Sequence, residues 1–249
     1  MKILVANPNT SSGVTDRLIA SAKLVASPGT ELLPMTATYG VPYIATRAEA
    51  VIGASAALEM LAQRRGDIDA AIVAAFGDPG LGGARELFDF PVVGMAEAAM
   101  LVACTLGRSF GIVSFSRSLE PWFAEIVAWH GLSGRCAAIR TLDEGFRSID
   151  EVQEEKEAVL VELAQRTVRE NAADVVILAG APLAGLANKI RDRVDVPLVD
   201  GIQAAVVVAE GLVRIQPRKA VAGTFRRPGP KVSKGLAPAL ADVIAHRGA

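Results

Sequence analysis

The chain has little of the material from which several common kinds of site are built. Its 249 residues include only two cysteines and two histidines, too few for a disulfide framework and poor material for a zinc site. The 26 basic and 27 acidic residues leave a formal net charge of −1, so no overall basic field attracts nucleic acid. We therefore expect no metal and no nucleic-acid partner.

Long apolar runs are also lacking, although 51% of the residues are hydrophobic. No run reaches the roughly 18 residues that a membrane span needs. The first apolar segment gives way early to the polar sequence NPNTS, before it reaches the roughly 7–15 residues of a signal-peptide core. We expect a cytoplasmic protein of one or two domains, without a membrane partner, that acts on a small molecule.

Short β-branched segments alternate with helical patterns along the chain. Several of these segments are apolar on both faces, as buried strands of a parallel sheet are, and a long helical pattern covers residues 150–173. The alternation predicts an α/β fold with parallel strands. The expected strands are Lys2–Ala6, Thr30–Met35, Ala70–Ala75, Pro91–Gly94, Phe110–Ser114, Ala137–Thr141, Asp174–Leu178 and Pro197–Asp200.

The second half of the chain repeats the first. Residues 69–99 align with residues 174–205, with identical pairs such as Gly80/Gly185. The repeat predicts two pseudo-symmetric α/β domains, formed by residues 1–95 with 206–249 and by residues 96–205. Their cleft would lie at the C-terminal ends of the strands. Ala75 and Gly180 occupy equivalent places there.

One hydroxyl-rich loop follows the first strand of each unit. The loop from Asn7 to Ser11 opens a helix, whose free N–H groups suit a carboxylate or a polarised carbonyl. The corresponding loop of the second unit runs from Ser114 to Ser118. Ordinary helix capping by Thr10 or Ser11 is the alternative. From these loops we predict ligand contacts by Asn9, Thr10, Ser11, Ser114 and Ser116.

A second pair of loops, Phe76–Gly80 and Ala179–Leu183, follows the central strands. Asp78 precedes Pro-Gly, which is typical of a turn and a helix cap, and the alternative is contact with a ligand. Glu97 and Asp200 also occupy paired positions after short strands. Such a carboxylate either transfers protons with a perturbed pKa or fixes a helix terminus.

A few single side chains stand outside these loops. Tyr43 and Arg47 follow the second strand, and Arg47 either binds a carboxylate bidentately or begins a surface helix. His130 ends a helical pattern, where a positive charge is favourable. For Cys104 and Cys136 we expect structural roles.

Several motifs together resemble the hydantoin/allantoin racemase branch of the aspartate/glutamate racemase superfamily, over almost the whole chain. The resemblance implies two pseudo-symmetric α/β domains with an active site between them, no cofactor and a homo-oligomer. It also implies inversion of a stereocentre next to a carbonyl in a small cyclic ureide or amino acid. The motifs are ANPNTS, FGDPGL, GMAEAAM, IVSFSR and VPLVDGIQAA.

The resemblance also implies a mechanism that this chain lacks the residues to perform. The family uses two cysteines on opposite faces of the stereocentre, since a thiol with a pKa of about 8.5 is easily activated. Their positions correspond here to Ala75 and Gly180, and Cys104 and Cys136 lie in other segments. Each general acid or base contributes roughly 10²–10⁴ in rate, so we expect the two-thiol reaction to be crippled.

Three hypotheses remain open. We favour an enzyme of this superfamily with different proton chemistry, including lyase or decarboxylase chemistry. The others are a hydantoin racemase homologue with weak or lost activity and a non-catalytic small-molecule binding protein. The predicted catalytic residues are Asp78 and Tyr43, and the predicted substrate-binding residues are Asn9, Thr10, Ser11, Arg47, Ala75, Phe76, Gly77, Ser114, Ser116, Gly180, Ala181 and Pro182.

Overall fold

A computed structural model describes residues 1–143 and 145–247. Its strands form two four-stranded sheets, of order β2-β1-β3-β4 and β6-β5-β7-β8, in which all neighbours run parallel. Each expected strand is confirmed, with bounds within two residues. The strands are β1 (Lys2–Asn7), β2 (Glu31–Thr36), β3 (Ala70–Val73), β4 (Val92–Gly94), β5 (Phe110–Ser114), β6 (Cys136–Thr141), β7 (Val175–Leu178) and β8 (Leu198–Asp200).

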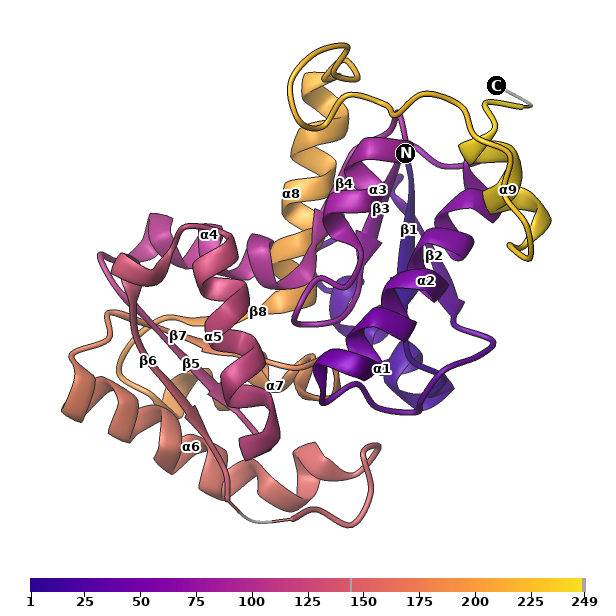
Figure 1. The fold of residues 1–249 in the computed structure, drawn as a ribbon. Helices are drawn as coiled ribbons and strands as arrows, with labels where there is room; N and C mark the ends of the chain where they lie inside the picture. Colours follow the sequence, from indigo (N-terminus) through magenta and orange to yellow (C-terminus); the bar gives the residue numbers. More distant parts are fainter. Residues whose placement is uncertain (144, 248–249) are drawn as a thin grey trace.

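The two sheets have the same strand order, with β5, β6, β7 and β8 in the places of β1, β2, β3 and β4 (Figure 1). The register pairs Ala6 of β1 with Val73 of β3, and Val113 of β5 with Leu178 of β7. Because parallel neighbours need a crossover connection, helices join the strands. The predicted α/β fold with two pseudo-symmetric parallel sheets is confirmed.

Local sequence fixes several of the helix ends. Ser11 accepts the N–H of Val14 as the N-cap of the first helix, and Thr46 with Glu49 forms a capping box for the second. The long helix expected over 150–173 is confirmed. The helices are α1 (Ser12–Ala22), α2 (Arg47–Arg64), α3 (Leu81–Leu87), α4 (Met95–Leu106), α5 (Glu120–Trp129), α6 (Val152–Asn171), α7 (Leu186–Ile190), α8 (Gly201–Ile215) and α9 (Pro238–Ile244).

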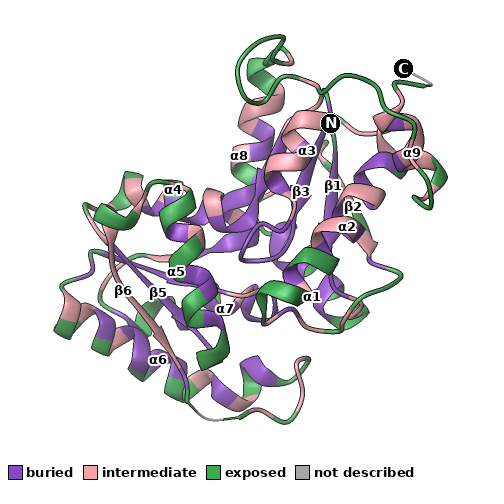
Figure 2. Ribbon diagram, viewed as in Figure 1, coloured by how far each residue is buried: buried purple, intermediate pink, exposed green. Residues whose placement is uncertain are grey.

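The central strands are buried on both faces, as Figure 2 shows for β1, β3 and β5. Residues such as Ile72 and Ile177 have no exposed surface, and full burial of each such side chain contributes about 1.5–3 kcal/mol. These rigid strands hold the turns that follow them at fixed positions, and those turns form the candidate site.

Two helices cross between the halves of the molecule. Helix α8 follows β8 of the second sheet but packs on β3 and β4 of the first and on α4. The expected domain boundary at 205/206 falls within this helix. Helix α5 follows β5 of the second sheet, and its side chains reach the turn after β3.

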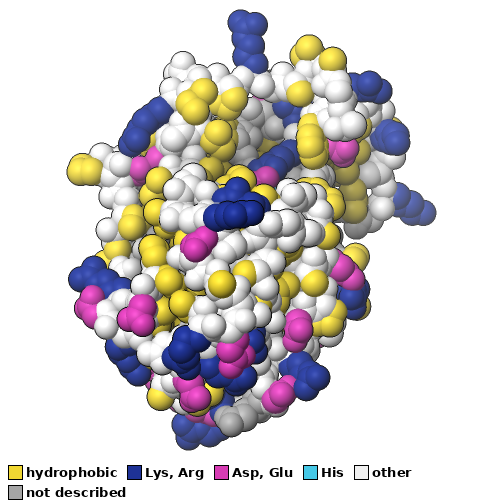
Figure 3. All heavy atoms as spheres, turned by 90° about the vertical axis from the view of Figure 1, so that its left-hand side faces the viewer, with side chains coloured by type: hydrophobic (Ala, Val, Ile, Leu, Met, Phe, Trp, Pro, Cys, Tyr) yellow, Lys and Arg dark blue, Asp and Glu magenta, His cyan; other side chains and the backbone are white. Residues whose placement is uncertain are grey.

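The surface carries charges of both signs. On the face shown in Figure 3, Lys and Arg side chains are interspersed with Asp and Glu. Within residues 1–143 and 145–247, no helix combines the length and apolarity of a membrane span.

Candidate active site

A small cavity lies between the C-terminal ends of the two sheets. Its volume is about 30 Å³, room for about one or two water molecules. Ala75 and Gly180 both line it, each two residues beyond the third strand of its sheet. Open parallel sheets bind ligands at this end of their strands. The lining consists of Asn9, Tyr43, Ile44, Ala75, Phe76, Phe115, Leu119, Trp122, Phe123, Gly180, Ala181 and Pro182.

The structure brings half of the predicted site residues to this cavity. The other half lies around it, either in the loops that support the lining or in a separate groove. The predicted residues outside the lining are Thr10, Ser11, Arg47, Gly77, Asp78, Ser114 and Ser116.

The two walls at Ala75 and Gly180 differ in how much side chain they tolerate. Gly180 has a φ of +114°, and a Cβ there would lie 2.7 Å from Cε1 of Phe115. Glycine is therefore required both by the backbone and by the packing. Ala75 has a side chain already and does not have a positive φ. Neither residue carries an ionisable group, so neither wall can transfer a proton.

Tyr43 is the titratable residue of the lining. Its ring packs against Phe115 and Phe146, with centroids 5.7 and 5.8 Å away. Its hydroxyl is buried and has no hydrogen-bond partner among the described residues. Burial raises the pKa of Tyr43, and the nearby hydroxyls of Ser116 and Ser118 offset part of the rise. The side chain is therefore a neutral hydrogen-bond donor at physiological pH.

Asn9 provides a second polar group. Its Oδ1 accepts from Asn7 Nδ2 at 3.0 Å and from the Ser11 N–H at 2.9 Å. These two donors fix the orientation of the amide, because only the oxygen can accept from them. No hydrogen bond from Asn9 Nδ2 is present among the described residues, so this NH₂ group is available to a ligand in the cavity.

The hydroxyls of the three predicted serines bind protein groups, and Thr10 is held through its backbone. Ser11 caps α1, and its Oγ donates to Asp150 at 3.0 Å. Ser114 Oγ donates to the Ala179 carbonyl at 2.8 Å and joins the ends of β5 and β7. Ser116 Oγ lies 2.9 Å from Ser118 Oγ. The Thr10 N–H donates to the Val41 carbonyl. These contacts hold the loops that shape the cavity.

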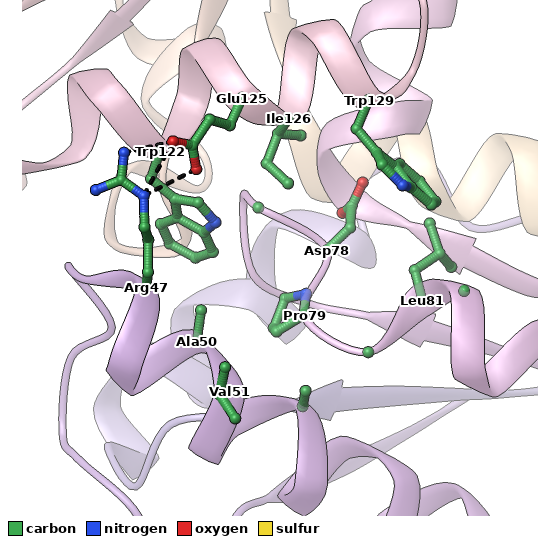
Figure 4. A pocket seen from close by; sticks show the side chains of 14 residues that line it. Arg47, Ala50, Val51, Asp78, Pro79, Leu81, Trp122, Glu125, Ile126 and Trp129 are labelled. Carbon is green, nitrogen blue, oxygen red and sulfur yellow. Dashed lines mark hydrogen bonds and ion pairs between the residues drawn. The ribbon is translucent and has the colours of Figure 1, made fainter.

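Arg47 and Asp78 lie instead along an outer groove of about 500 Å³ between α2 and α5 (Figure 4). Arg47, the first residue of α2, pairs with Glu125 of α5 through its Nε and Nη2. The groove is otherwise largely apolar. Among the described residues, Trp122 alone lines both this groove and the inner cavity, so its indole ring forms the partition between them.

Asp78 is 5% exposed and binds three donors. Its carboxylate accepts the N–H groups of Ala96 and Glu97, both at 2.8 Å, at the start of α4. His130 Nε2 lies 3.1 Å from Asp78 Oδ2. Burial raises the pKa of Asp78, whereas these three donors favour its ionised form. The carboxylate points toward α5 (Figure 4), and Asp78 is not part of the lining of the inner cavity.

His130 connects two carboxylates. It is the C-cap residue of α5, as expected, but its ring binds Asp78, and its Nδ1 lies 3.6 Å from Glu97 Oε1. Burial lowers the pKa of His130, but the hydrogen bonds and charges of Asp78 and Glu97 outweigh burial and raise it to about 9. The imidazole is therefore protonated at neutral pH.

The two carboxylates that the sequence paired have different partners. Burial alone raises the pKa of Glu97, but His130 and Arg85 lower it to about 2. Asp200 is the N-cap of α8 and accepts from the N–H groups of Ile202 and Gly185. Burial raises the pKa of Asp200, and its hydrogen bonds oppose the rise. Each carboxylate thus fixes neighbouring structure.

No sulfur lies in the cavity lining. Cys104 and Cys136 are half-buried elsewhere, and burial raises the pKa of Cys136 to about 11. In the part of the chain that the structure describes, no three His, Cys, Asp or Glu side chains are grouped to hold a metal ion.

The sequence did not single out Trp122, and it assigned His130 only to a helix end. Trp122 lies on α5 and His130 is its C-cap residue, eight positions further on, but their partners are on the turn after β3, which is more than 40 residues away. The internal repeat aligns the strands and turns of the two units and does not show where a helix of one unit meets the other.

Comparison with known proteins agrees with this architecture. The family model for Asp/Glu/Hydantoin racemase matches residues 3–209. A hydantoin racemase from Paenarthrobacter aurescens is 32% identical over 93% of this chain and 99% of its own length.

Two solved structures also match over nearly the whole chain. The allantoin racemase from Klebsiella pneumoniae is 32% identical and has a TM-score of 0.91, covering 96% of this chain and 98% of its own. The allantoin racemase from Pseudomonas fluorescens is 33% identical and has a TM-score of 0.87, covering 94% of this chain and 100% of its own. The chain belongs to the Asp/Glu/Hydantoin racemase family, in its hydantoin/allantoin racemase branch.

Proposed function

We propose that this protein is a cofactor-independent enzyme that protonates an enolate-like intermediate of a small carbonyl compound from one face, with Tyr43 as proton donor. One observation carries the proposal: the cavity between the two sheets contains Tyr43 as its titratable group, with a buried hydroxyl that lacks a partner among the described residues. A buried unpartnered hydroxyl is costly, about 1–3 kcal/mol, unless a ligand binds it.

The lining favours a small carbonyl compound, for which the cavity of about 30 Å³ must widen on binding. The Asn9 NH₂ group and the Tyr43 hydroxyl offer donors to oxygen, while Phe76, Phe115 and Trp122 form apolar walls. Donors in a site without water stabilise the negative charge that develops on a carbonyl oxygen as an enolate forms. Cyclic ureides such as hydantoin and allantoin are the first candidates, because the named relatives are racemases of these compounds. We propose action in the cytoplasm as a homo-oligomer.

The absence of sulfur favours chemistry on one face. The family resemblance assigns the positions of the two thiols to Ala75 and Gly180, which carry no ionisable group. Racemisation requires a proton acceptor and a proton donor on opposite faces of the stereocentre. With one titratable residue among the described residues of the lining, the site supports protonation from a single face.

A phenol with a raised pKa is protonated at neutral pH, so Tyr43 can donate a proton there but cannot remove one. The enolate then arises in one of two ways. Hydroxide from the solvent removes the proton next to the carbonyl and becomes water, or a carboxylate on that carbon leaves as CO₂ and its C–C electron pair enters the enolate. In either case Tyr43 gives its proton to carbon, and water reprotonates the phenolate. The second way is a decarboxylation.

In place of the predicted proton transfer by Asp78, we propose that this carboxylate holds the turn after β3. Its oxygens bind the start of α4 and the imidazole of His130, and its side chain lies outside the cavity lining.

The test is proton exchange at the carbon next to the carbonyl, followed by NMR in ²H₂O near pH 7. Hydantoins, allantoin, amino acids and small dicarboxylates, including a monosubstituted malonate, form the substrate panel. We expect deuterium incorporation or CO₂ release with at least one compound, and a loss of roughly 10²–10⁴-fold in Tyr43→Phe.

The chain offers a matched control, because its only other tyrosine, Tyr39, is exposed and binds Ser55. Tyr39→Phe should retain the full rate. Turnover that is equal in Tyr43→Phe and wild type would exclude the proposed donor. A compound that stabilises the protein against heat but is never exchanged or consumed would favour a binding protein instead.

A further inference from the structure

Helix α5, which follows β5 of the second sheet, supplies part of the cavity wall. Trp122 and Phe123, near its N-terminal end, line the cavity. The Trp122 indole lies where a side chain at Gly77 would be, since a Cβ on Gly77 would overlap the ring. The size and closure of the cavity therefore depend on how α5 is held against the turn after β3.

Two polar contacts hold α5 in this place. The pair Arg47–Glu125 is more than half exposed at both side chains, and such surface pairs contribute little. The second contact is at the C-terminal end of the helix, where the His130 side chain is 5% exposed and that of Asp78 is 1% exposed. A charged contact that is shielded from water in this way is the stronger of the two.

Asp78 transmits this contact to the cavity wall. It has a φ of +48°, and its own N–H donates to the Ala75 carbonyl at 3.1 Å. Its carboxylate also fills the space above Gly94, where a Cβ would lie within 2.7 Å of all three carboxyl atoms. A shift of the carboxylate would therefore move the backbone that carries Ala75 and Phe76.

We propose that His130 is a positioning residue for the cavity: by binding Asp78 it fixes the turn that carries Ala75 and Phe76, and it seats Trp122 of its own helix against Gly77. The catalytic consequence of this role rests on the proposed function, whereas its effect on Trp122 does not. His130 acts through these neighbours and does not itself line the cavity.

The titration of His130 makes the role measurable. The groups that face its ring are the carboxylates of Asp78 and Glu97 and the edge of Trp129, and Arg85 is bound to Glu97. Because the pKa of His130 is raised from 6.5 to about 9, the contact is at full strength below about pH 6.5. It is lost as the pH rises through about 9, while Tyr43 stays protonated.

The experiment uses the fluorescence of Trp122 to report whether its indole ring stays packed against the turn after β3. The chain has two tryptophans, both on α5, so Trp129→Phe leaves Trp122 alone and keeps a ring beside His130. Acrylamide quenching of the Trp122 fluorescence is measured from pH 6 to about 9.5 in this background, around the expected pKa. The variants are His130→Ala, His130→Gln and, as control, His246→Gln at the other histidine, which is exposed.

We expect the parent protein to become more quenchable as the pH rises through about 9. His130→Ala should be quenchable at every pH, and the kcat for exchange should fall by roughly tenfold or more, because small displacements of positioned groups are costly. His130→Gln, which still donates to Asp78, should restore protection and most activity at pH 7 but lose the pH dependence. His246→Gln should match the parent.

The proposal is overturned if His130→Ala and His130→Gln keep the parent's Trp122 protection and its pH profile. Equal loss of protection in both variants, with a pH dependence that persists in His130→Gln, would also contradict it. Should no compound be exchanged by the wild type, the proposed function fails, and the quenching result still decides the role of His130. If His130→Ala does not fold, the parent titration and His130→Gln decide it.

Discussion

Each half of the molecule uses one buried carboxylate to join the turn after its third strand to the helix after its fourth strand. The carboxylate belongs to the turn in the first half and to the start of the helix in the second. In the first half, Asp78 belongs to the turn after the third strand and binds the Ala96 N–H at the start of α4. In the second half, Asp200 belongs to the start of α8 and binds both the Ile202 N–H of that helix and the Gly185 N–H of the turn. Either way, one buried carboxylate joins the third-strand turn to the helix after the fourth strand.

Each carboxylate is also bound by a helix of the other half. His130 at the end of α5 reaches Asp78, and Ser21 near the end of α1 reaches Asp200 at 3.2 Å. Helices α1 and α5 follow the equivalent strands β1 and β5, so these two contacts between the halves, which we call braces, are pseudo-equivalent. Only the brace at Asp78 is an ionic contact. The comparison teaches that the repeat preserves a contact between a buried carboxylate and a helix of the other half, and that an imidazole makes this contact in one copy and a hydroxyl in the other.

We expect the largest loss of stability when Asp78 is replaced. In Asp78→Ala, the His130 imidazolium loses a buried counter-ion and α4 loses its cap. Removing one partner of a buried pair costs about 3–5 kcal/mol, and we expect a loss of that size in the free energy of unfolding. Urea denaturation near pH 7 measures it. A loss below about 1 kcal/mol would show that the contact acts like an exposed surface pair.

The next largest effect should distinguish the two cavity walls, when each is replaced by cysteine and the free energy of unfolding is compared. Gly180→Cys should lower the free energy of unfolding by about 2–3 kcal/mol, because it combines a φ that is unfavourable for side chains with overlap of Phe115. Ala75→Cys should change it by less than about 1 kcal/mol. Thermal and urea unfolding of the two single variants make the comparison. Equal losses would mean that the walls are not as different as their geometry indicates.

The neutral brace should be the weaker of the two. Asp200→Ala removes the N-cap of α8, for which we expect a cost of about 1–2 kcal/mol. The difference from Asp78→Ala should shrink as the pH rises through about 9, since the pKa of His130 lies in that window. Urea unfolding of both variants at pH 7 and near pH 10 provides the test. A constant difference would contradict an ionic role for His130.

The smallest effect on stability should come from Tyr43→Phe. Its hydroxyl has no partner among the described residues, so its removal should be neutral or stabilise the fold by up to about 1 kcal/mol. Differential scanning calorimetry measures the change. A marked destabilisation would indicate that the hydroxyl is bound within the protein and is not reserved for a ligand.

Sequence alone predicted the parallel sheets and the equivalence of Ala75 and Gly180, because strand pattern and internal repeat are local or linear signals. It also placed Asn9 and Tyr43 among the candidates. It could not show that the Asp78 side chain lies outside the cavity lining, because the sequence Asp-Pro-Gly is compatible with a side chain that points into the cavity and with one that points out of it. Nor could it place Trp122, whose role depends on how α5 packs across the two halves.

The central claim is that only one side of the cavity carries a group able to give a proton to carbon. The most direct measurement is the stereochemical course of deuterium incorporation, followed by chiral chromatography and NMR with separate enantiomers of an exchanged substrate. The account predicts product protonated on a single face, with that selectivity and the rate both lost in Tyr43→Phe. Inversion of both enantiomers at equal rates would contradict it.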